Sequence, residues 1–287
     1  GRFVRIVDNL LTGHKSNIAD IIDSVEFIEA DMGDPETASA AVEDIDVVLH
    51  QGALPSVPKS VEDPAATHRH CVDATFTLLM AARDAGVKRF VYAASSSAYG
   101  DSAQLPKVEH MPVKPLSPYA AAKLMGEHYC SVFYNVFGLE TIALRYFNVF
   151  GPYQDPSSQY AAAIPAFVTA ILNKTSPVIY GDGEQSRDFS YIENVVTANL
   201  LAAQAEKTAG QSVNIACGKS VTVNEIIKYI NEITGNDIEP VYEEVRPGDV
   251  KHSIADISLA KEVIGYEPAV YFEEGLSRAI EWYRDNL

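Results

Sequence analysis

Short apolar runs alternate along the chain with longer segments whose apolar residues recur at helical spacing. The runs are rich in β-branched and aromatic residues and cover positions 3–7, 25–28, 47–49, 89–93 and 141–145. Segments 65–85 and 119–137 have the helical spacing, and Gly86 and Gly138 follow them as stop signals. Strands that alternate with helices in this way predict an α/β fold with a doubly wound parallel sheet of Rossmann type.

The pattern changes after Gly151, where loops rich in Pro, Gly, Ser and Tyr separate shorter predicted helices over 223–233 and 272–285. No internal repeat or long linker divides the chain. We therefore predict an NAD-binding Rossmann domain over 1–150, completed by part of 188–216. A smaller α/β substrate lobe is expected to comprise residues 151–187 and 217–287.

The beginning of the predicted sheet departs from the usual pattern of dinucleotide-binding folds. Such folds open with a strand, a Gly-rich turn and a helix, but the chain contains no G-x-G-x-x-G motif. We therefore expect a sheet that lacks its first strand and Gly-rich turn. Asp8, at the end of the first apolar run, then stands where an acidic residue binds the adenosine ribose. Taken alone, an aspartate after a strand is more often a turn former.

Composition and charge argue against several classes of protein. The 287 residues include 39 acidic and 22 basic ones, and the resulting formal charge of −17 opposes binding to nucleic acid or anionic lipid. The three cysteines are widely spaced and form no C-x-x-C motif, so neither a disulfide framework nor a metal site is expected. The apolar stretch 161–172 is too short to cross a bilayer. A cytoplasmic protein without a membrane role fits these features.

Tyr119 and Lys123 form the clearest candidate for chemistry. Four residues apart in a predicted helix, they share one face and lie one turn apart. A tyrosine with a pKa near 10 becomes a base at neutral pH only if its phenolate is stabilised by about three pKa units, roughly 4 kcal/mol, which a neighbouring ammonium helps to supply. A lone Y-x-x-x-K is also common as a surface pair.

The context of the pair favours function over chance. A helix-start signature, Leu116-Ser-Pro118, comes just before it, and the serine cluster Ser95-Ser-Ser97 ends an apolar strand 24 residues earlier. Ligands of α/β sheets bind at the carboxyl ends of strands, where these serines would lie. The Ser95 hydroxyl could then hydrogen-bond a substrate oxygen while Tyr119 removes its proton. A polar loop is the alternative interpretation of the serine run.

With these motifs the chain resembles the extended short-chain dehydrogenase/reductases, and within them the UDP-hexose 4-epimerases similar to UDP-N-acetylglucosamine 4-epimerases. The resemblance covers essentially the whole chain. It rests on Asp8-Asn9, Asp31-Met32, His50-Gln-Gly-Ala53, Ser95-Ser-Ser-Ala-Tyr-Gly100, Tyr119 with Lys123, Arg145-Tyr-Phe-Asn148, Gly181-Asp-Gly183, Ser186-Arg-Asp188 and Arg246-Pro-Gly-Asp249. Together these motifs are far more specific than any one of them.

The resemblance implies C4 epimerisation of a UDP-hexose with NAD as a tightly held, recycled cofactor. A hydride leaves sugar C4, a 4-keto intermediate turns in the site, and the hydride returns to the other face. Tyr119 is then the base, Lys123 lowers its pKa and holds the nicotinamide ribose, and Ser95 is the hydroxyl partner of the sugar oxygen. The other implied NAD contacts are Asp8, Asn9, Asp31, Met32, Gln51, Gly52, Ala53 and Tyr146.

The resemblance also implies a UDP-sugar site. In this acidic protein the motifs place two arginines, Arg187 and Arg246, whose planar guanidinium groups suit a pyrophosphate. The other substrate contacts that it implies are Ser56, Ser96, Ser97, Asn148, Ile164, Val178, Tyr180, Asp249 and Ser253. For Ile164 and Val178 a packing role is an equal alternative. A homodimer that packs through the helices near 65–85 and 119–137 is implied as well.

Two positions bear on the reaction and the sugar. Related enzymes that dehydrate or decarboxylate the keto sugar have an acidic residue just after the catalytic hydroxyl, where this chain has Ser96 and Ser97. A serine does not replace a carboxylate in proton transfer near neutrality, so a dehydratase or decarboxylase is the less favoured enzyme. Epimerases restricted to UDP-glucose and UDP-galactose have a tyrosine where this chain has Ser253. The smaller serine favours UDP-N-acetylglucosamine and UDP-N-acetylgalactosamine and still admits UDP-glucose and UDP-galactose.

Two further observations keep alternatives open. Cys71 stands where the family usually has an asparagine, within His70-Cys-Val-Asp-Ala-Thr75 instead of Asn-Val-x-Gly-Thr. We expect that substitution to affect one hydrogen bond next to the site and not the reaction. A dinucleotide-binding fold without catalysis, serving as a sensor module, is the alternative of another class. The joint presence of Ser95, Tyr119 and Lys123 argues against it.

Overall fold

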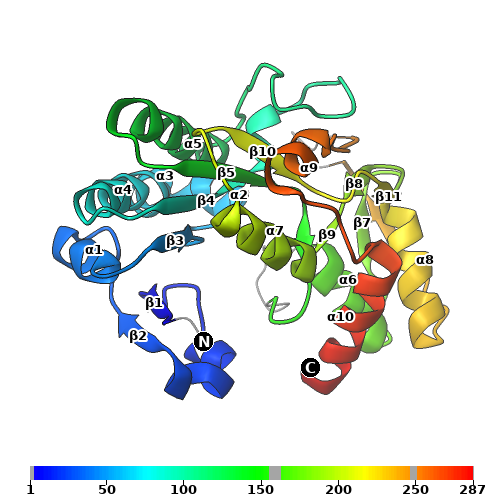
Figure 1. Cartoon of the computed structure of the whole chain (residues 1–287). Coiled ribbons are helices and arrows are strands. Elements are labelled where there is room, and N and C mark those ends of the chain that lie inside the picture. Colours follow the sequence, from blue (N-terminus) through cyan, green and yellow to red (C-terminus); the bar gives the residue numbers. More distant parts are fainter. Residues whose placement is uncertain (1–2, 155–162, 246–250, 287) are drawn as a thin grey trace. The chain divides into compact units, whose positions relative to one another are not determined.

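A computed structural model describes residues 3–154, 163–245 and 251–286 (Figure 1). Contacts divide the chain into two compact units. Unit 1 comprises residues 1–98, 115–145 and 202–213, and unit 2 comprises residues 99–114, 146–201 and 214–287. Residues 99–114 thus lie with unit 2 and residues 202–213 with unit 1, whereas the sequence predicted one domain over 1–150 completed by part of 188–216. The assignment of one part to NAD and the other to the nucleotide sugar remains a prediction.

The strands of unit 1 begin and end close to the predicted apolar runs. They are β1 (Arg5–Asp8), β2 (Glu26–Glu29), β3 (Val47–His50), β4 (Arg89–Ser95), β5 (Thr141–Tyr146) and β10 (Ser212–Ile215), of which β5 and β10 end in unit 2. Strand β1 pairs with β2 in parallel, and β3 pairs with β4 in parallel. All but the last residue of β4 are buried. The predicted α/β fold with a parallel sheet is confirmed.

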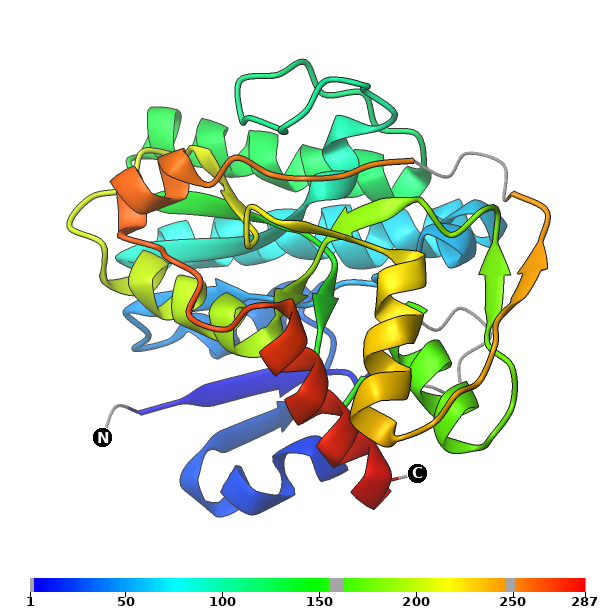
Figure 2. The same cartoon turned by 90° about the vertical axis from the view of Figure 1, so that its right-hand side faces the viewer.

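Among the described residues, the strands of this sheet form two groups, β2-β1 and β3-β4-β5-β10. Figure 2 shows β1 and β2 side by side as the blue arrows. In the usual doubly wound order, 3-2-1-4-5-6, the first strand lies between the second and the fourth. Here β1 and β3 correspond to those two neighbours. The split into two groups falls where the sequence predicts that the first strand is lacking.

The helical elements of unit 1 follow the strands. They are the 3-10 helix η1 (Lys15–Ser24), α1 (Pro35–Val42), α2 (Val57–Glu62), α3 (Pro64–His68), the π-helical turn η2 (Arg69–Asp73), α4 (Ala74–Asp84) and α5 (Pro118–Phe137), with the short 3-10 turn η3 (Ser96–Tyr99) running on into unit 2. The predicted helix over 65–85 is therefore interrupted by a π-helical turn, a feature often found at functional sites.

Helix α5 has well-defined ends that fix its position along β4. The Ser117 side chain accepts a hydrogen bond from the Ala120 amide, and Pro118 opens the first turn. Gly138, with a φ of 74°, ends the helix, and its amide donates to the Tyr134 carbonyl at 3.0 Å. The predicted helix over 119–137 is thus confirmed. These caps determine which residues face the strand, because α5 packs against β4.

Unit 2 has its own core. Its strands are β6 (Val149–Phe150), β7 (Val178–Tyr180), β8 (Ser186–Asp188), β9 (Ser190–Tyr191), β11 (Ser220–Thr222) and β12 (Val241–Glu243), and its helices are α6 (Ala163–Leu172), α7 (Ile192–Gln204, whose last turn lies with unit 1), α8 (Val223–Thr234), α9 (Ser258–Ile264) and α10 (Phe272–Asn286). Helices α6, α8 and α10 pack together (Figure 2). Their apolar faces bury a cluster that includes Ile171, Ile226 and Leu276. In the described part of the chain, no helix is long and apolar enough to cross a membrane.

A buried ion pair ties α5 to β5 in unit 1. The Arg145 guanidinium donates to both oxygens of the Glu127 carboxylate, at 2.7 Å from Nη2 to Oε2 and 3.0 Å from Nε to Oε1. The Ser212 hydroxyl of β10 donates to the same carboxylate at 3.0 Å. Both side chains of the pair are less than a tenth exposed. Loss of one partner would leave the other charge buried without compensation.

We predict that Glu127→Gln lowers the free energy of unfolding by about 3 kcal/mol, because the Arg145 guanidinium then stays buried without an opposite charge. The matched control is Asp46→Asn, which removes an ion pair of similar distance, 2.7 Å to Lys88, between two largely exposed side chains. That change is expected to be small. Urea unfolding of both variants measures the effect, and equal losses would contradict the structural role of the buried pair.

Candidate active site

Ser95 and Tyr119 meet where β4 ends and α5 begins. Ser95 is the last residue of β4, and Tyr119 lies in the first turn of α5. The Ser95 side chain lies close enough to the Tyr119 hydroxyl to lower its pKa. Ser97 donates to the Ser95 oxygen through its amide at 3.2 Å and through its hydroxyl at 2.8 Å. The structure therefore brings together the two hydroxyls that the sequence predicts to share the reacting oxygen.

Lys123 lies one turn further along α5 and is buried. Its ammonium donates to the carbonyl oxygen of Ala93, two residues before Ser95, at 2.8 Å. It also lies 5.0 Å from the centroid of the Tyr92 ring. In this structure the ammonium is thus held by strand β4. The predicted triad of Ser95, Tyr119 and Lys123 lies on two adjacent elements of unit 1.

Burial dominates the electrostatics of the triad. It raises the pKa of Tyr119 to about 12, against which the Ser95 hydrogen bond acts. It lowers the pKa of Lys123 to about 8, against which Cys71, Cys130 and Glu127 act. Desolvation disfavours the charged form of each group. A phenolate at Tyr119 therefore requires positive charge beyond what these side chains supply without a ligand.

His50 adds a buried neutral group beside the triad. Its Nε2 lies 2.8 Å from the Thr75 hydroxyl, which donates to the Cys71 carbonyl at 2.7 Å. Burial, together with the charge of Lys123, lowers the pKa of His50 to about 3. The Cys71 thiol accepts a weak hydrogen bond from the Leu54 amide at 3.4 Å. Cys71 thus anchors the segment after β3, where the family pattern would place an asparagine.

The residues expected to contact NAD follow the carboxyl ends of β1, β2 and β3. Asp8 ends β1, and the Asn9 amide donates to the Asp31 carboxylate at 3.2 Å. A Cβ atom at Gly52 would lie 2.5 Å from the methyl carbon of Met32, so Gly52 permits a close approach there. Carboxylates suit ribose hydroxyls, and the ends of parallel strands are where dinucleotides bind. These residues fit NAD, although Gln51 is exposed and Tyr146 belongs to unit 2.

Strand β8 organises the residues of unit 2 that are predicted to contact the nucleotide. The Asp188 carboxylate accepts hydrogen bonds from the amides of Cys217, Gly218 and Ala255. Burial raises the pKa of Asp188 to about 6, against the effect of these bonds. Its backbone carbonyl accepts from the Asn148 amide at 2.8 Å. Asp188 was not among the predicted contacts, although it belongs to the motif Ser186-Arg-Asp188 on which the resemblance partly rests.

Arg187 and Ser253 both form hydrogen bonds with the Ser186 carbonyl of β8. The Arg187 guanidinium donates to the carbonyls of Ser186 and Lys251 at 3.0 and 3.2 Å. The Ser253 amide donates to the Ser186 carbonyl at 3.0 Å, and the half-buried Ser253 side chain occupies little space. The structure therefore gathers Asn148, Arg187 and Ser253 around β8.

The remaining predicted substrate contacts are more scattered. Ile164 is a buried member of the unit 2 core, whereas Val178 and Tyr180 lie on β7 and are at least partly exposed. Ser56 caps α2, with its hydroxyl accepting from the Lys59 amide at 3.3 Å. Arg246 and Asp249 lie outside the described residues. No group of three or more potential metal ligands occurs within the described ranges.

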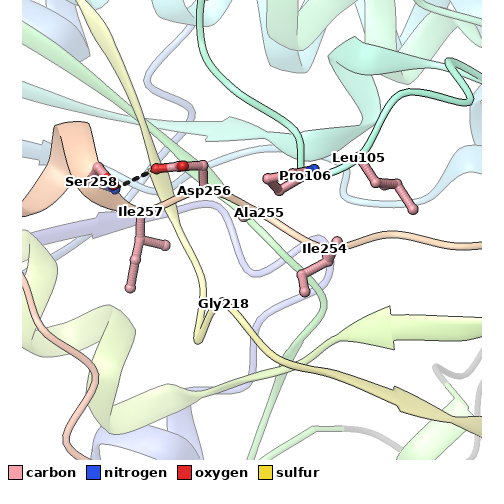
Figure 3. A pocket seen from close by; sticks show the side chains of 8 residues that line it. All are labelled: Leu105, Pro106, Gly218, Ile254, Ala255, Asp256, Ile257 and Ser258. Carbon is pink, nitrogen blue, oxygen red and sulfur yellow. Dashed lines mark hydrogen bonds between the residues drawn. The ribbon is translucent and has the colours of Figure 1, made fainter.

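One pocket of about 450 Å³ lies in unit 2 (Figure 3). Leu105, Pro106, Gly218 and residues 254–258 line it. Its acidic side chain, Asp256, accepts a hydrogen bond from the Ser258 amide at 2.8 Å. None of the residues predicted from the sequence lines this pocket, so we base the candidate site on the side-chain geometry instead.

Comparison with known proteins shows which family this chain is similar to. The sequence model of the NAD dependent epimerase/dehydratase family matches residues 1–216. A UDP-N-acetylglucosamine 4-epimerase from Methanobrevibacter ruminantium M1, solved with UDP-N-acetylmuramic acid, is 40% identical with a TM-score of 0.95 over 99% of this chain and 91% of that one. A UDP-glucose 4-epimerase from Thermotoga maritima, solved with UDP-glucose, is 37% identical with a TM-score of 0.94 over 100% of this chain and 92% of that one.

Several relatives found by sequence comparison are also named as UDP-sugar epimerases. A UDP-glucose 4-epimerase from Mycolicibacterium smegmatis is 34% identical over 283 residues, which cover 97% of this chain and 90% of that protein. These likenesses confirm the predicted resemblance and the Rossmann-type fold, and they confirm NAD as the cofactor of the family. The chain belongs to the NAD dependent epimerase/dehydratase family.

Proposed function

We propose that this protein is an NAD-dependent UDP-hexose 4-epimerase that interconverts UDP-N-acetylglucosamine and UDP-N-acetylgalactosamine and also accepts UDP-glucose and UDP-galactose. The placement of Ser95 beside Tyr119, with Lys123 one turn further along α5, is the observation that carries the proposal. The similar proteins named as UDP-sugar 4-epimerases support the reaction class.

The chain's own residues would move one proton. The chemistry that NAD would supply when bound is reversible hydride transfer, in which the hydrogen on sugar C4 leaves with two electrons and later returns. The Tyr119 oxygen takes the proton from the C4 hydroxyl as the keto sugar forms, and gives it back when the alcohol is restored. Ser95 binds the same sugar oxygen and keeps it within reach of Tyr119. The Lys123 ammonium, together with the positive charge of the cofactor, favours the phenolate.

The neighbours of Ser95 support epimerisation over elimination. Dehydration or decarboxylation of the keto sugar needs a second acid or base, and the residues after Ser95 are Ser96 and Ser97. The Ser97 hydroxyl donates to the Ser95 oxygen, so it is already used to orient Ser95. A sensor without catalysis would not need Ser95 and Tyr119 side by side next to a buried lysine.

The substrate's nucleotide is assigned to unit 2. We propose that Arg187 and Arg246 bind the pyrophosphate, and that Asn148, Ile164, Val178, Tyr180 and Asp249 contact the rest of the uridine diphosphate. The anchoring of β8 by Asp188 supports this, because it fixes Arg187. Ser253 leaves room for an N-acetyl group, and Ser56, Ser96 and Ser97 complete the sugar contacts.

Tyr119→Phe is expected to lower turnover of UDP-sugars by at least about 10²-fold, because the phenyl ring takes up no proton. The fold should persist, since the ring remains. The measurement is the rate of C4 epimer formation with added NAD, with circular dichroism as the control for folding. A folded variant that turns over at the rate of the parent protein would refute the assigned base.

Ser253→Tyr is expected to lower kcat/KM for UDP-N-acetylglucosamine by about tenfold or more while UDP-glucose is affected less, because the ring fills the space for the N-acetyl group. Ser220→Tyr, on an exposed residue of β11, serves as the matched control. Equal losses for both sugars in the Ser253 variant would contradict the proposed role of this position.

We further propose that the protein acts in the cytoplasm as a homodimer. All three cysteines are free and buried, which suits a reducing compartment. Helices α4 and α5 of unit 1 expose several large apolar side chains, and such exposed apolar surface marks interfaces between subunits. They are Phe76, Met125, Val132, Val136 and Phe137.

The dimer proposal predicts a mass in solution of twice the 31.2 kDa of the chain. Val136→Glu, at a residue 66% exposed on α5, should shift the population towards monomer because a charge enters the interface. Val241→Glu, on an exposed residue of β12, is the control and should leave the mass unchanged. Analytical ultracentrifugation distinguishes the dimer from the monomer. A parent protein that is monomeric in solution would contradict the proposed interface.

A further inference from the structure

Tyr92 is a buried residue of unit 1 to which the proposed reaction assigns no role. It lies in β4, three residues before Ser95, and is fully buried. Its ring lies 5.8 Å from that of His50, centroid to centroid, on β3. Its hydroxyl reaches the backbone of α5, the helix that carries Tyr119 and Lys123. Tyr92 therefore lies between the two elements that carry the triad.

Two contacts of Tyr92 and one of the adjacent Ala93 join β4 to the first half of α5. The Lys123 ammonium lies 5.0 Å from the centroid of its ring, within the range of a cation–π interaction. Its hydroxyl donates a long hydrogen bond, 3.4 Å, to the backbone carbonyl of Lys123. The adjacent Ala93 carbonyl accepts from the same ammonium at 2.8 Å. One stretch of β4 thus holds both the side chain and the backbone of Lys123.

Gly126 makes this close approach possible. A Cβ atom at position 126 would lie 2.3 Å from both the hydroxyl oxygen and the Cζ atom of Tyr92, and 2.7 Å from Cε1. Because the ring is fully buried, it has little room to move away. Gly126 therefore fixes how near α5 comes to β4 at the level of Lys123.

We propose that Tyr92 is a positioning residue with two roles. Its ring favours the charged form of the Lys123 side chain. Its packing against Gly126 sets the distance between β4 and α5 that brings Ser95 close to Tyr119. The proposal rests on the proposed function for its catalytic consequence. Its structural part concerns Lys123 alone and is measurable without turnover.

Several other ionisable groups face Lys123, and their charges decide how much the Tyr92 ring contributes to stabilising the ammonium. Glu127 and Cys130 face it from α5, Cys71 from η2 and His50 from β3. Glu127 is already paired with Arg145, and His50 is neutral near pH 7. The thiols of Cys71 and Cys130 are buried, and burial raises the pKa of Cys130. The aromatic ring, 5.0 Å from the ammonium, and the Ala93 carbonyl, at 2.8 Å, therefore add to the compensation for the buried charge.

The test compares Tyr92→Leu with Tyr92→Phe in the full chain. Leucine removes the aromatic face, whereas phenylalanine keeps it and loses only the long hydrogen bond. NMR titration of isotope-labelled lysine side chains follows Lys123, and the pH profile of kcat follows catalysis with UDP-N-acetylglucosamine. Tyr92→Leu should move the Lys123 titration and the alkaline limb of the kcat profile to lower pH by about one unit. Without the aromatic ring, the ammonium becomes less stable relative to the neutral amine. Tyr92→Phe should keep both near their original pH.

Phe133→Leu is the matched control, because it replaces another buried ring of α5 that lies away from Lys123. It should leave the titration of Lys123 unchanged. The proposal is overturned if Tyr92→Leu titrates like the parent protein, or if Tyr92→Phe shifts as far as Tyr92→Leu. If the parent protein turns over no UDP-sugar, the proposed function fails, whereas the NMR titration still decides the role of Tyr92.

A second pair of variants covers the case in which Tyr92→Leu does not fold. Gly126→Ala should lower kcat by about tenfold or more with little change in KM, because α5 is displaced from β4 where Tyr119 meets Ser95. Gly275→Ala is the control, since its Cβ would lie 2.9 Å from Tyr191, in unit 2. Unchanged kcat in Gly126→Ala, or the same loss in both variants, would overturn the spacing role.

Discussion

The close packing of α5 on β4 is the constraint on which the candidate active site depends. One strand supplies Ser95 at its end and the Ala93 carbonyl two residues earlier, and one helix supplies Tyr119 and Lys123 one turn apart. Neither element holds the triad alone. The caps of α5 set its position along the helix axis, and the contact of Gly126 with Tyr92 sets its distance from the strand. The Glu127–Arg145 pair attaches the same helix to β5.

Burial shifts the pKa values of both ionisable side chains of the triad, and one of the two shifts opposes catalysis. A lysine that is nearly inaccessible to water loses hydration, which lowers the pKa of Lys123 to about 8. The same burial raises the pKa of Tyr119 to about 12, the direction opposite to the one a general base needs. The balance favours the phenolate only when further positive charge is present. NAD in its oxidised form carries such a charge on the nicotinamide, so the site suits a base that becomes effective with the cofactor bound.

Much of unit 1 could be predicted from the sequence, because its signals are local. The apolar runs predicted β1 to β5 within a few residues, and the four-residue spacing placed Tyr119 and Lys123 on one face of α5. The π-helical turn at Arg69–Asp73 was not predictable, because the helical spacing continues through it. The roles of Tyr92, Glu127 and Asp188 also escaped prediction. Each depends on partners distant in the sequence, such as Arg145 for Glu127 and the Ala255 amide for Asp188.

The most direct measurement of the central claim is to incubate the protein, with added NAD, with UDP-N-acetylglucosamine and UDP-glucose in separate reactions and to identify the products. C4 epimerisation predicts the corresponding galacto-configured UDP-sugar, an equilibrium mixture reached from either side, and no net reduction of NAD. A dehydrated or decarboxylated sugar, or NADH accumulating in proportion to product, would contradict it.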